Sequence, residues 1–272
     1  MFTIEEVRPG FTMGAFRSAI FDFDGTISLI REGWQQVMVP YFIEVLSDTP
    51  KGRDEPGIEA VVRDFVDFLT GKQTIYQCIR LAEEVEQRGG KPPDPLEYKK
   101  EYSRRLLVRI DDRLSGLRGG KLDPASLRVP GSMRFLSKLR ERGIKLYLAS
   151  GTDIEYVRDE VRLLKLESLF EGGIYGALDS FEDFSKAMII SQMIRENDLH
   201  GTELMGFGDG YVEIENTCEV GGYAVGMATD EVRRDGIDEW KRGRLIAAGA
   251  HIICPDFSDP EALLAHLFPG DD

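Results

Sequence analysis

The pattern of hydrophobic and polar positions changes twice along the chain. Residues 18–23 form a short apolar run, which predicts a buried strand. From about Gln35 onward, apolar residues recur at intervals of three or four, the spacing of an amphipathic helix. The segments with this spacing are EGWQQVMVPYFIEVLSD, GIEAVVRDFVDFLTG, TIYQCIRLAEEVEQRGG and PLEYKKEYSRRLLVRIDDRLSG. Turn-rich breaks separate them, so residues 30–127 are expected to be all-helical.

Beyond residue 127, short apolar runs alternate with helical patterns. The predicted strands are IKLYLA, ELMGFG, GYAVGMA and AHIIC, and the helices include GSMRFLSKLRERG and DIEYVRDEVRLLKL. Alternating strands and helices predict a parallel sheet with helices on both faces. The predicted fold class is therefore α/β: a Rossmann-like parallel-sheet core of residues 1–29 and 128–272, with an all-helical domain, residues 30–127, inserted after its first strand.

Composition and charge restrict the partners that we expect. The 272 residues include 48 acidic and 34 basic side chains, a net charge of −14, which argues against nucleic acid and anionic membranes as partners. The sequence MFTIEEVRPGF lacks the pattern of a signal peptide, and no apolar run is long enough to span a bilayer. The cysteines, Cys78, Cys218 and Cys254, are scattered, as expected of reduced thiols in a cytoplasmic protein. The sequence does not indicate an oligomeric state.

Carboxylates follow two of the predicted strands. The run AIFDFDGT ends a strand with Asp22 and Asp24, and ELMGFG is followed by Asp209 and then Glu213. Ligands of open α/β sheets bind at the carboxyl ends of the strands, so we expect these side chains to converge at one edge. Four carboxylates at one place repel one another unless a cation offsets their charge. The prediction is a Mg²⁺ site, because Mg²⁺ prefers oxygen ligands.

Groups that could hold an anion lie near the same predicted edge. IKLYLA is followed by Ser150 and Gly151, and Lys186 begins a predicted helix. Each has an ordinary alternative: Ser150 and Gly151 form a simple turn or helix cap, Lys186 is a solvated surface lysine, and Glu213 belongs to a solvated helical turn. The order of these residues and their positions at strand ends together favour a common site.

With these motifs in place, the sequence resembles the haloacid dehalogenase superfamily over residues 18–29 and 128–268. DFDGT is similar to the family's first motif, in which a hydrophobic strand runs into Asp-x-Asp-Gly-Thr, and LASGT resembles the second. Lys186 is placed like the lysine of the third motif, and GFGDGYVE resembles the fourth, GDxxxD, with Glu213 where the family more often has Asp. The helical insertion resembles the C1 cap of the β-phosphoglucomutase-like branch.

The resemblance implies catalytic roles for the two strand-end aspartates. Asp22 would be the nucleophile that accepts a phosphoryl group, and Asp24 the general acid and base. Mg²⁺ would be bound by Asp22, the backbone carbonyl of Asp24, and Asp209, with Glu213 close by.

The resemblance also implies a set of substrate-binding residues. Ser150, the Gly151 amide and Lys186 would hold the phosphoryl oxygens. Thr26 belongs to the same set and is expected to hydrogen-bond within the turn that follows Asp24. Arg31, where the chain enters the insertion, would face an anionic substrate, or is an ordinary surface or packing residue.

The expected function is that of a Mg²⁺-dependent phosphatase that hydrolyses a small phosphorylated metabolite through an aspartyl-phosphate. A phosphosugar mutase of the same superfamily is the alternative, since it uses the same pair of aspartates. A non-catalytic phosphoacceptor domain is less favoured, because it needs neither Asp24 as an acid nor an insertion of this size. The sequence does not identify the substrate.

Overall fold

The computed structural model describes residues 2–13, 16–178 and 185–270. The chain forms two compact units, residues 1–32 with 116–272 and residues 33–115. The predicted helical insertion, residues 30–127, encloses the second unit.

The first unit is built on a sheet with the strand order β1-β7-β6-β5-β2-β3-β4. All neighbouring strands pair in parallel except β1, which is antiparallel to β7. The strands are β1 (Glu5–Glu6), β2 (Ser18–Phe21), β3 (Lys145–Asp153), β4 (Gly173–Ala177), β5 (Leu204–Gly208), β6 (Tyr223–Met227) and β7 (Ile252–Cys254). The sheet confirms the predicted α/β fold class, with an antiparallel strand added at one edge.

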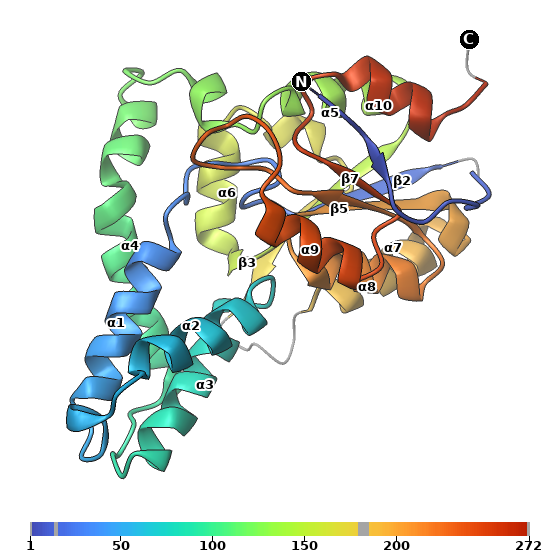
Figure 1. Ribbon diagram of the computed structural model, residues 1–272. Coiled ribbons are helices and arrows are strands. Elements are labelled where there is room, and N and C mark those ends of the chain that lie inside the picture. The colour runs from blue at the N-terminus through green and yellow to red at the C-terminus, as the bar shows by residue number, and fades with distance from the viewer. Residues whose placement is uncertain (1, 14–15, 179–184, 271–272) are drawn as a thin grey trace. The chain divides into compact units, whose positions relative to one another are not determined.

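Helices cover both faces of this sheet. They are α5 (Ser132–Glu141), α6 (Ile154–Leu163), α7 (Lys186–Asn197), α8 (Tyr211–Glu219), α9 (Glu239–Ala247) and α10 (Pro260–Leu267), with 3₁₀ turns η2 (Pro124–Leu127), η3 (Glu167–Leu169) and η5 (Gly201–Glu203). Helices α7, α8 and α9 lie on one face, and α5 and α10 lie on the other (Figure 1). The core between α5 and the sheet is aromatic. Phe21 stacks on Phe207 with ring centroids 4.5 Å apart, and Phe135 stacks on Phe257 with ring centroids 5.0 Å apart.

Strand β2 lies between β5 and β3, and its position brings distant parts of the chain together. Phe21, its last residue, pairs with Leu148 of β3 on one side and with Phe207 of β5 on the other. Because the three strands are parallel, their carboxyl ends meet at the same edge. The residues that follow Phe21, Ala149 and Gly208 therefore come from three separate segments but lie at one edge.

The strands that the hydrophobic pattern predicted are all present, and the described residues form two further strands that it did not predict. Strand β1 has only two residues, Glu5 and Glu6, which are too polar and too few to form a recognisable run. Strand β4 has the sequence GIYGA, and its two glycines are more typical of a turn. Backbone pairing with β3 holds this segment as a strand, although its sequence does not favour one.

The second unit consists of the four predicted helices and one 3₁₀ turn. They are α1 (Gln35–Ser47), α2 (Ile58–Leu69), α3 (Thr74–Gln87) and α4 (Pro95–Arg118), with η1 (Gly52–Asp54). Phe42 of α1 stacks on Phe65 of α2, with ring centroids 5.9 Å apart. Leu81 of α3 is also fully buried, so the apolar stripes of the predicted helices form the core of this unit.

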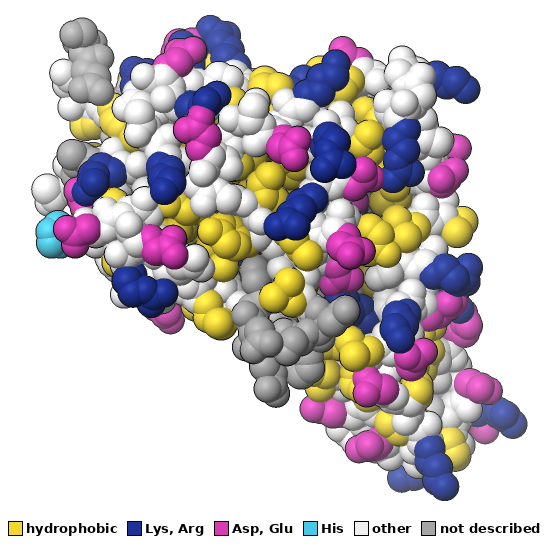
Figure 2. All heavy atoms as spheres, turned by 180° about the vertical axis from the view of Figure 1, so that it is seen from behind, with side chains coloured by type: hydrophobic (Ala, Val, Ile, Leu, Met, Phe, Trp, Pro, Cys, Tyr) yellow, Lys and Arg dark blue, Asp and Glu magenta, His cyan; other side chains and the backbone are white. Residues whose placement is uncertain are grey.

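The surface of the described chain is polar and of mixed charge. On the face drawn in Figure 2, basic and acidic side chains are interspersed, and the yellow hydrophobic side chains lie between them. Among the described residues, every helix is too short or too polar to cross a membrane.

Candidate active site

The site begins at a tight turn directly after β2. The backbone carbonyl of Phe23 accepts hydrogen bonds from the amides of Ile27 and Ser28, at 2.9 and 2.8 Å. Gly25 lies within this turn with a φ of +75°, a conformation that residues with a Cβ rarely adopt. The turn keeps Asp22 and Asp24 at the sheet edge.

Asp22 is held by a lysine from a different element. Ser185 caps α7 by accepting a hydrogen bond from the Met188 amide at 3.1 Å, so Lys186 is the first residue of this helix. The Nζ atom of Lys186 lies 2.7 Å from Oδ1 of Asp22 and also pairs with Glu213 of α8. All three side chains are buried. Burial raises the pKa of Asp22, and the charge of Lys186 opposes that shift.

Asp24 is oriented by the end of β3. The Thr152 hydroxyl donates to Oδ2 of Asp24 at 2.9 Å, and the Ser150 hydroxyl lies 3.4 Å from the same oxygen. The Thr152 amide in turn donates to the Ser150 hydroxyl at 3.1 Å, across Gly151. Burial raises the pKa of Asp24 to about 6, although the nearby charge of Arg31 opposes the shift. Asp24 therefore titrates closer to neutral pH than an ordinary carboxyl does.

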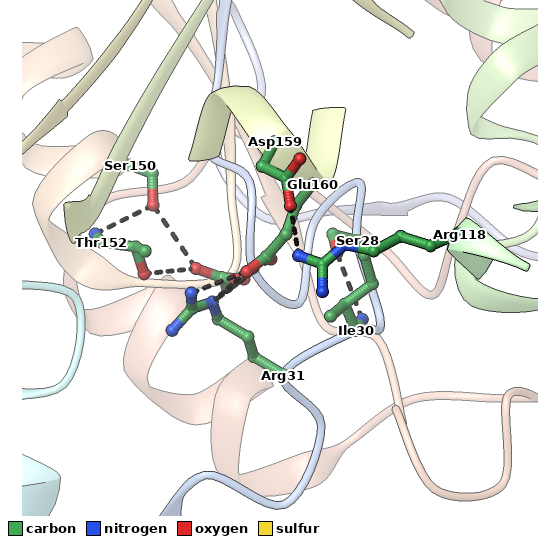
Figure 3. A network of polar contacts seen from close by, with 9 residues as sticks. Ser28, Ile30, Arg31, Arg118, Ser150, Thr152, Asp159 and Glu160 are labelled. Atoms are coloured by element: carbon green, nitrogen blue, oxygen red, sulfur yellow. Dashed lines mark hydrogen bonds and ion pairs between the residues drawn. The ribbon is translucent and has the colours of Figure 1, made fainter. Parts of the chain in front are cut away.

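Arg31 forms a buried ion pair with Glu160 (Figure 3). Its Nε and Nη2 atoms donate to Oε1 of Glu160 in α6, at 3.0 and 2.6 Å. Its guanidinium lies over the Tyr156 ring, and its Nε is 3.9 Å from Oδ1 of Asp24. The side chain of Glu160 is only 2% exposed, so Arg31 belongs to an interior ion pair, which excludes a surface residue and is compatible with the packing residue that we also considered. Substrate binding by Arg31 stays a prediction.

A second lysine reaches Asp209, which follows β5. The Nζ atom of Lys241, in α9, lies 2.8 Å from Oδ2 of Asp209 and 2.7 Å from Oε1 of Glu231. Burial opposes the charge of Lys241, but the two carboxylates outweigh burial and raise its pKa. The Asp209 carboxylate packs against the backbone of Gly25, where a Cβ would lie only 2.1 Å from Oδ2.

The oxygen ligands predicted for Mg²⁺ come from two segments at this edge, one after β2 and one after β5. The carboxylates are those of Asp22, Asp209 and Glu213, and the backbone carbonyl is that of Asp24, two residues after Asp22. In the described part of the chain, no three His, Cys, Asp or Glu side chains are arranged closely enough to hold a metal ion. Instead, lysines pair with these carboxylates. Oε2 of Glu213 is buried and accepts no hydrogen bond from the described residues. An all-oxygen, mostly carboxylate set is chemically suited to a hard divalent cation.

One predicted interaction is wrong. The Thr26 hydroxyl was expected to hydrogen-bond within the turn, but it is buried and has no hydrogen-bond partner among the described residues. Backbone hydrogen bonds close this turn instead, including one from the Gly25 amide to the Ser28 carbonyl at 2.9 Å. The placement of Thr26 in the substrate-binding set stays a prediction.

Four residues of this region were not among the predicted site residues: Thr152, Glu160, Glu231 and Lys241. A sequence signal existed for Thr152, because residues two apart on a strand share a face and Ser150 was already identified. Glu160 and Lys241 lie on amphipathic helices among several other charged residues, so their sequences do not single them out.

Comparisons with known proteins bear on the family and the fold of this chain. The family model of haloacid dehalogenase-like hydrolases matches residues 16–215. No curated protein sequence matches the chain.

Solved structures are similar in fold at low sequence identity. A predicted phosphoglycolate phosphatase from Haemophilus somnus 129PT is 15% identical with a TM-score of 0.60, covering 93% of this chain and 100% of that one. A putative β-phosphoglucomutase from Thermotoga maritima is 17% identical with a TM-score of 0.52, with the same coverage. A phosphonoacetaldehyde hydrolase-like protein from Oleispira antarctica is 15% identical with a TM-score of 0.63, covering 95% of this chain and 94% of that one.

The family match spans both the turn after β2 and the acidic segment after β5, which the parallel sheet brings to one edge. On this match and this fold, the chain belongs to the haloacid dehalogenase-like hydrolases.

Proposed function

We propose that this protein is a Mg²⁺-dependent phosphatase that hydrolyses a small phosphorylated metabolite through an aspartyl-phosphate on Asp22. The observation that carries the proposal is the pair of differently held aspartates after β2. Asp22 is paired with Lys186 at 2.7 Å, and Asp24 accepts a hydrogen bond from Thr152 at 2.9 Å. Two carboxyl groups in different environments are suited to different roles in one reaction.

In the first step, a carboxylate oxygen of Asp22 attacks phosphorus, and the bond from phosphorus to the ester oxygen breaks. Asp24 gives its proton to that leaving oxygen, which departs as an alcohol. Burial raises the pKa of Asp24, which favours the protonated form that a general acid requires. Burial also raises the pKa of Asp22, but the Lys186 ammonium at 2.7 Å opposes that shift and favours the ionised form that a nucleophile requires. The Thr152 hydroxyl, which donates to Asp24 at 2.9 Å, orients the group that makes this transfer.

In the second step, water attacks phosphorus of the aspartyl-phosphate and the bond from phosphorus to the Asp22 oxygen breaks. Asp24, now deprotonated, takes a proton from the attacking water. Inorganic phosphate leaves, and both side chains return to their starting states. Dividing the displacement in this way replaces one difficult step with two easier ones.

Cationic and hydrogen-bonding groups would hold the phosphoryl oxygens. Lys186, the Ser150 hydroxyl and the Gly151 amide would donate to them, and the buried Thr26 hydroxyl is a further candidate donor. Preorganised donors of this kind stabilise the charge that develops in the transition state.

The cation is a further part of the proposal, because haloacid dehalogenase-like hydrolases generally use Mg²⁺. Asp22, the Asp24 carbonyl and Asp209 would hold it, with Glu213 close by. When bound, Mg²⁺ would offset the negative charges of the carboxylates and the phosphate.

The test is the replacement of the proposed nucleophile. Asp22→Asn should reduce turnover of p-nitrophenyl phosphate with Mg²⁺ by several orders of magnitude and leave the protein folded. Asp112→Asn, a change on the exposed face of α4, is the matched control and should keep wild-type turnover. Near-wild-type turnover by Asp22→Asn would refute the mechanism.

A screen of phosphorylated metabolites then separates hydrolysis from the mutase alternative. A phosphatase releases free phosphate, whereas a phosphosugar mutase returns an isomer of its substrate. Failure to turn over any phosphate ester would favour the non-catalytic phosphoacceptor instead.

A further inference from the structure

Asp209, from the fourth predicted motif, forms a group of charges with Lys241 and Glu231, which lie outside the predicted motifs; we call it the Asp209 charge group. We propose that Lys241 and Glu231 are positioning residues that set the affinity of Asp209 for a divalent cation, with Lys241 lowering it and Glu231 raising it. The inference rests on the proposed function, in which Asp209 is a ligand of Mg²⁺.

The Asp209 charge group is compact and largely buried. The Lys241 ammonium lies 2.8 Å from one carboxylate and 2.7 Å from the other, so it bridges Asp209 and Glu231. The side chain of Lys241 is 9% exposed, and those of both carboxylates are 17% exposed. Screening by solvent is therefore weak here, and a change of one charge acts strongly on its neighbours.

The backbone of Lys241 is held at the start of α9. Asp238 caps this helix, and its Oδ1 accepts a hydrogen bond from the Lys241 amide at 3.0 Å. A cation in the first turn of a helix is unfavourable, because the helix dipole is positive there, and burial adds to that cost. The two carboxylates offset both effects, so the buried ammonium of Lys241 depends on its contacts with them.

Asp209 has little freedom to move away from this lysine. Its Oδ2 atom packs against the backbone of Gly25, and Oε1 of Glu231 lies 3.1 Å from the place where a Cβ of residue 25 would be. A divalent cation bound to Asp209 would therefore lie close to the Lys241 ammonium. Repulsion between the two cations lowers the affinity, and the negative charge of Glu231 compensates part of that repulsion.

This charge balance predicts effects of opposite sign for two substitutions. Lys241→Met removes the competing positive charge and should tighten binding of the cation by about tenfold or more. Glu231→Gln leaves the positive charge less compensated and should weaken binding by a similar factor. The double variant should bind nearly as the wild type does, and Lys241→Arg, which keeps the charge, should also stay near wild type.

The experiment is titration of the chelator-treated full chain with Mg²⁺ alone, without substrate, followed by isothermal calorimetry and by the shift of thermal unfolding. Glu239→Gln is the matched control: it removes a carboxylate from the same helix, but the side chain of Glu239 is 77% exposed, and the affinity should not change. If Lys241→Met does not fold, Glu231→Gln and the double variant still test the signs.

Shifts of the same sign, or no shift beyond that of the control, would overturn the inference while leaving the proposed phosphatase intact. Absence of Mg²⁺ binding by the wild type would overturn both the inference and the proposed use of Mg²⁺. Retention of turnover by Asp22→Asn would overturn the proposed mechanism alone.

Discussion

Gly25 lies in the turn after β2, where this turn meets the Asp209 charge group. Gly25→Ala therefore tests whether the turn and the approach of Asp209 require glycine. A Cβ at this position would lie 2.1 Å from Oδ2 of Asp209 and 3.1 Å from Oε1 of Glu231. To restore an ordinary contact of 3.4 Å, the Asp209 oxygen must retreat by about 1.3 Å. The backbone φ of +75° adds a second cost, because a side chain makes this conformation unfavourable.

The two costs can be given separate magnitudes. An L-residue in the left-handed region costs about 1–2 kcal/mol of folding free energy. Overpacking against neighbours that cannot move freely adds about 1–3 kcal/mol. Displacement of a catalytic-site group by roughly 1 Å can reduce turnover by about a hundredfold. Gly25→Ala should therefore lower both the free energy of unfolding and the turnover of phosphate esters.

Gly221→Ala is the control that isolates the backbone cost. Gly221 has a φ of +79°, nearly the same as Gly25, but a Cβ there meets nothing within 4 Å. Urea unfolding of both variants should give a larger loss of stability for Gly25→Ala, and turnover should fall only in that variant. Equal losses of stability together with unchanged turnover would refute the argument that Gly25 is required by the approach of Asp209.

Two further predictions concern single hydrogen bonds. Thr152→Val keeps the side-chain shape but removes the 2.9 Å hydrogen bond to Asp24, so turnover should fall by about tenfold with a loss of only about 1 kcal/mol in urea unfolding; unchanged turnover would contradict the orienting role. His251 is buried, which lowers its pKa, as does the charge of Arg8, and its Nδ1 accepts from the Ala224 amide at 3.0 Å. Its neutral form therefore stabilises the fold fully above its unfolded pKa of about 6.5, and this contribution is lost as the pH falls below that value. On acidification, the free energy of unfolding of the wild type should fall by up to about 1.4 kcal/mol per pH unit more than that of His251→Gln. If the free energy of unfolding in urea falls equally with pH in both proteins, the neutral form of His251 does not stabilise the fold.

The local features of this protein follow from its sequence. The apolar run before Asp22 and the three-to-four spacing of residues 30–127 determine a buried strand and amphipathic helices, because each needs only neighbours in the chain to define its buried face. The same holds for the polar residues that end the strands. Since parallel strands present their carboxyl ends at one edge, the approach of Asp22, Ser150 and Asp209 could be predicted from the pattern as well.

The ion pairs at this edge were decided only by the tertiary structure. Arg31 pairs with Glu160, which is 129 residues away, and Lys241 of α9 pairs with Asp209, which follows β5. Each of these residues stands among other charged residues on an amphipathic helix or beside a turn, so the sequence does not tell which one is buried. The choice depends on how a helix is rotated and how far it lies from the sheet edge. Those quantities are set by packing of the whole core, not by the local order of residues.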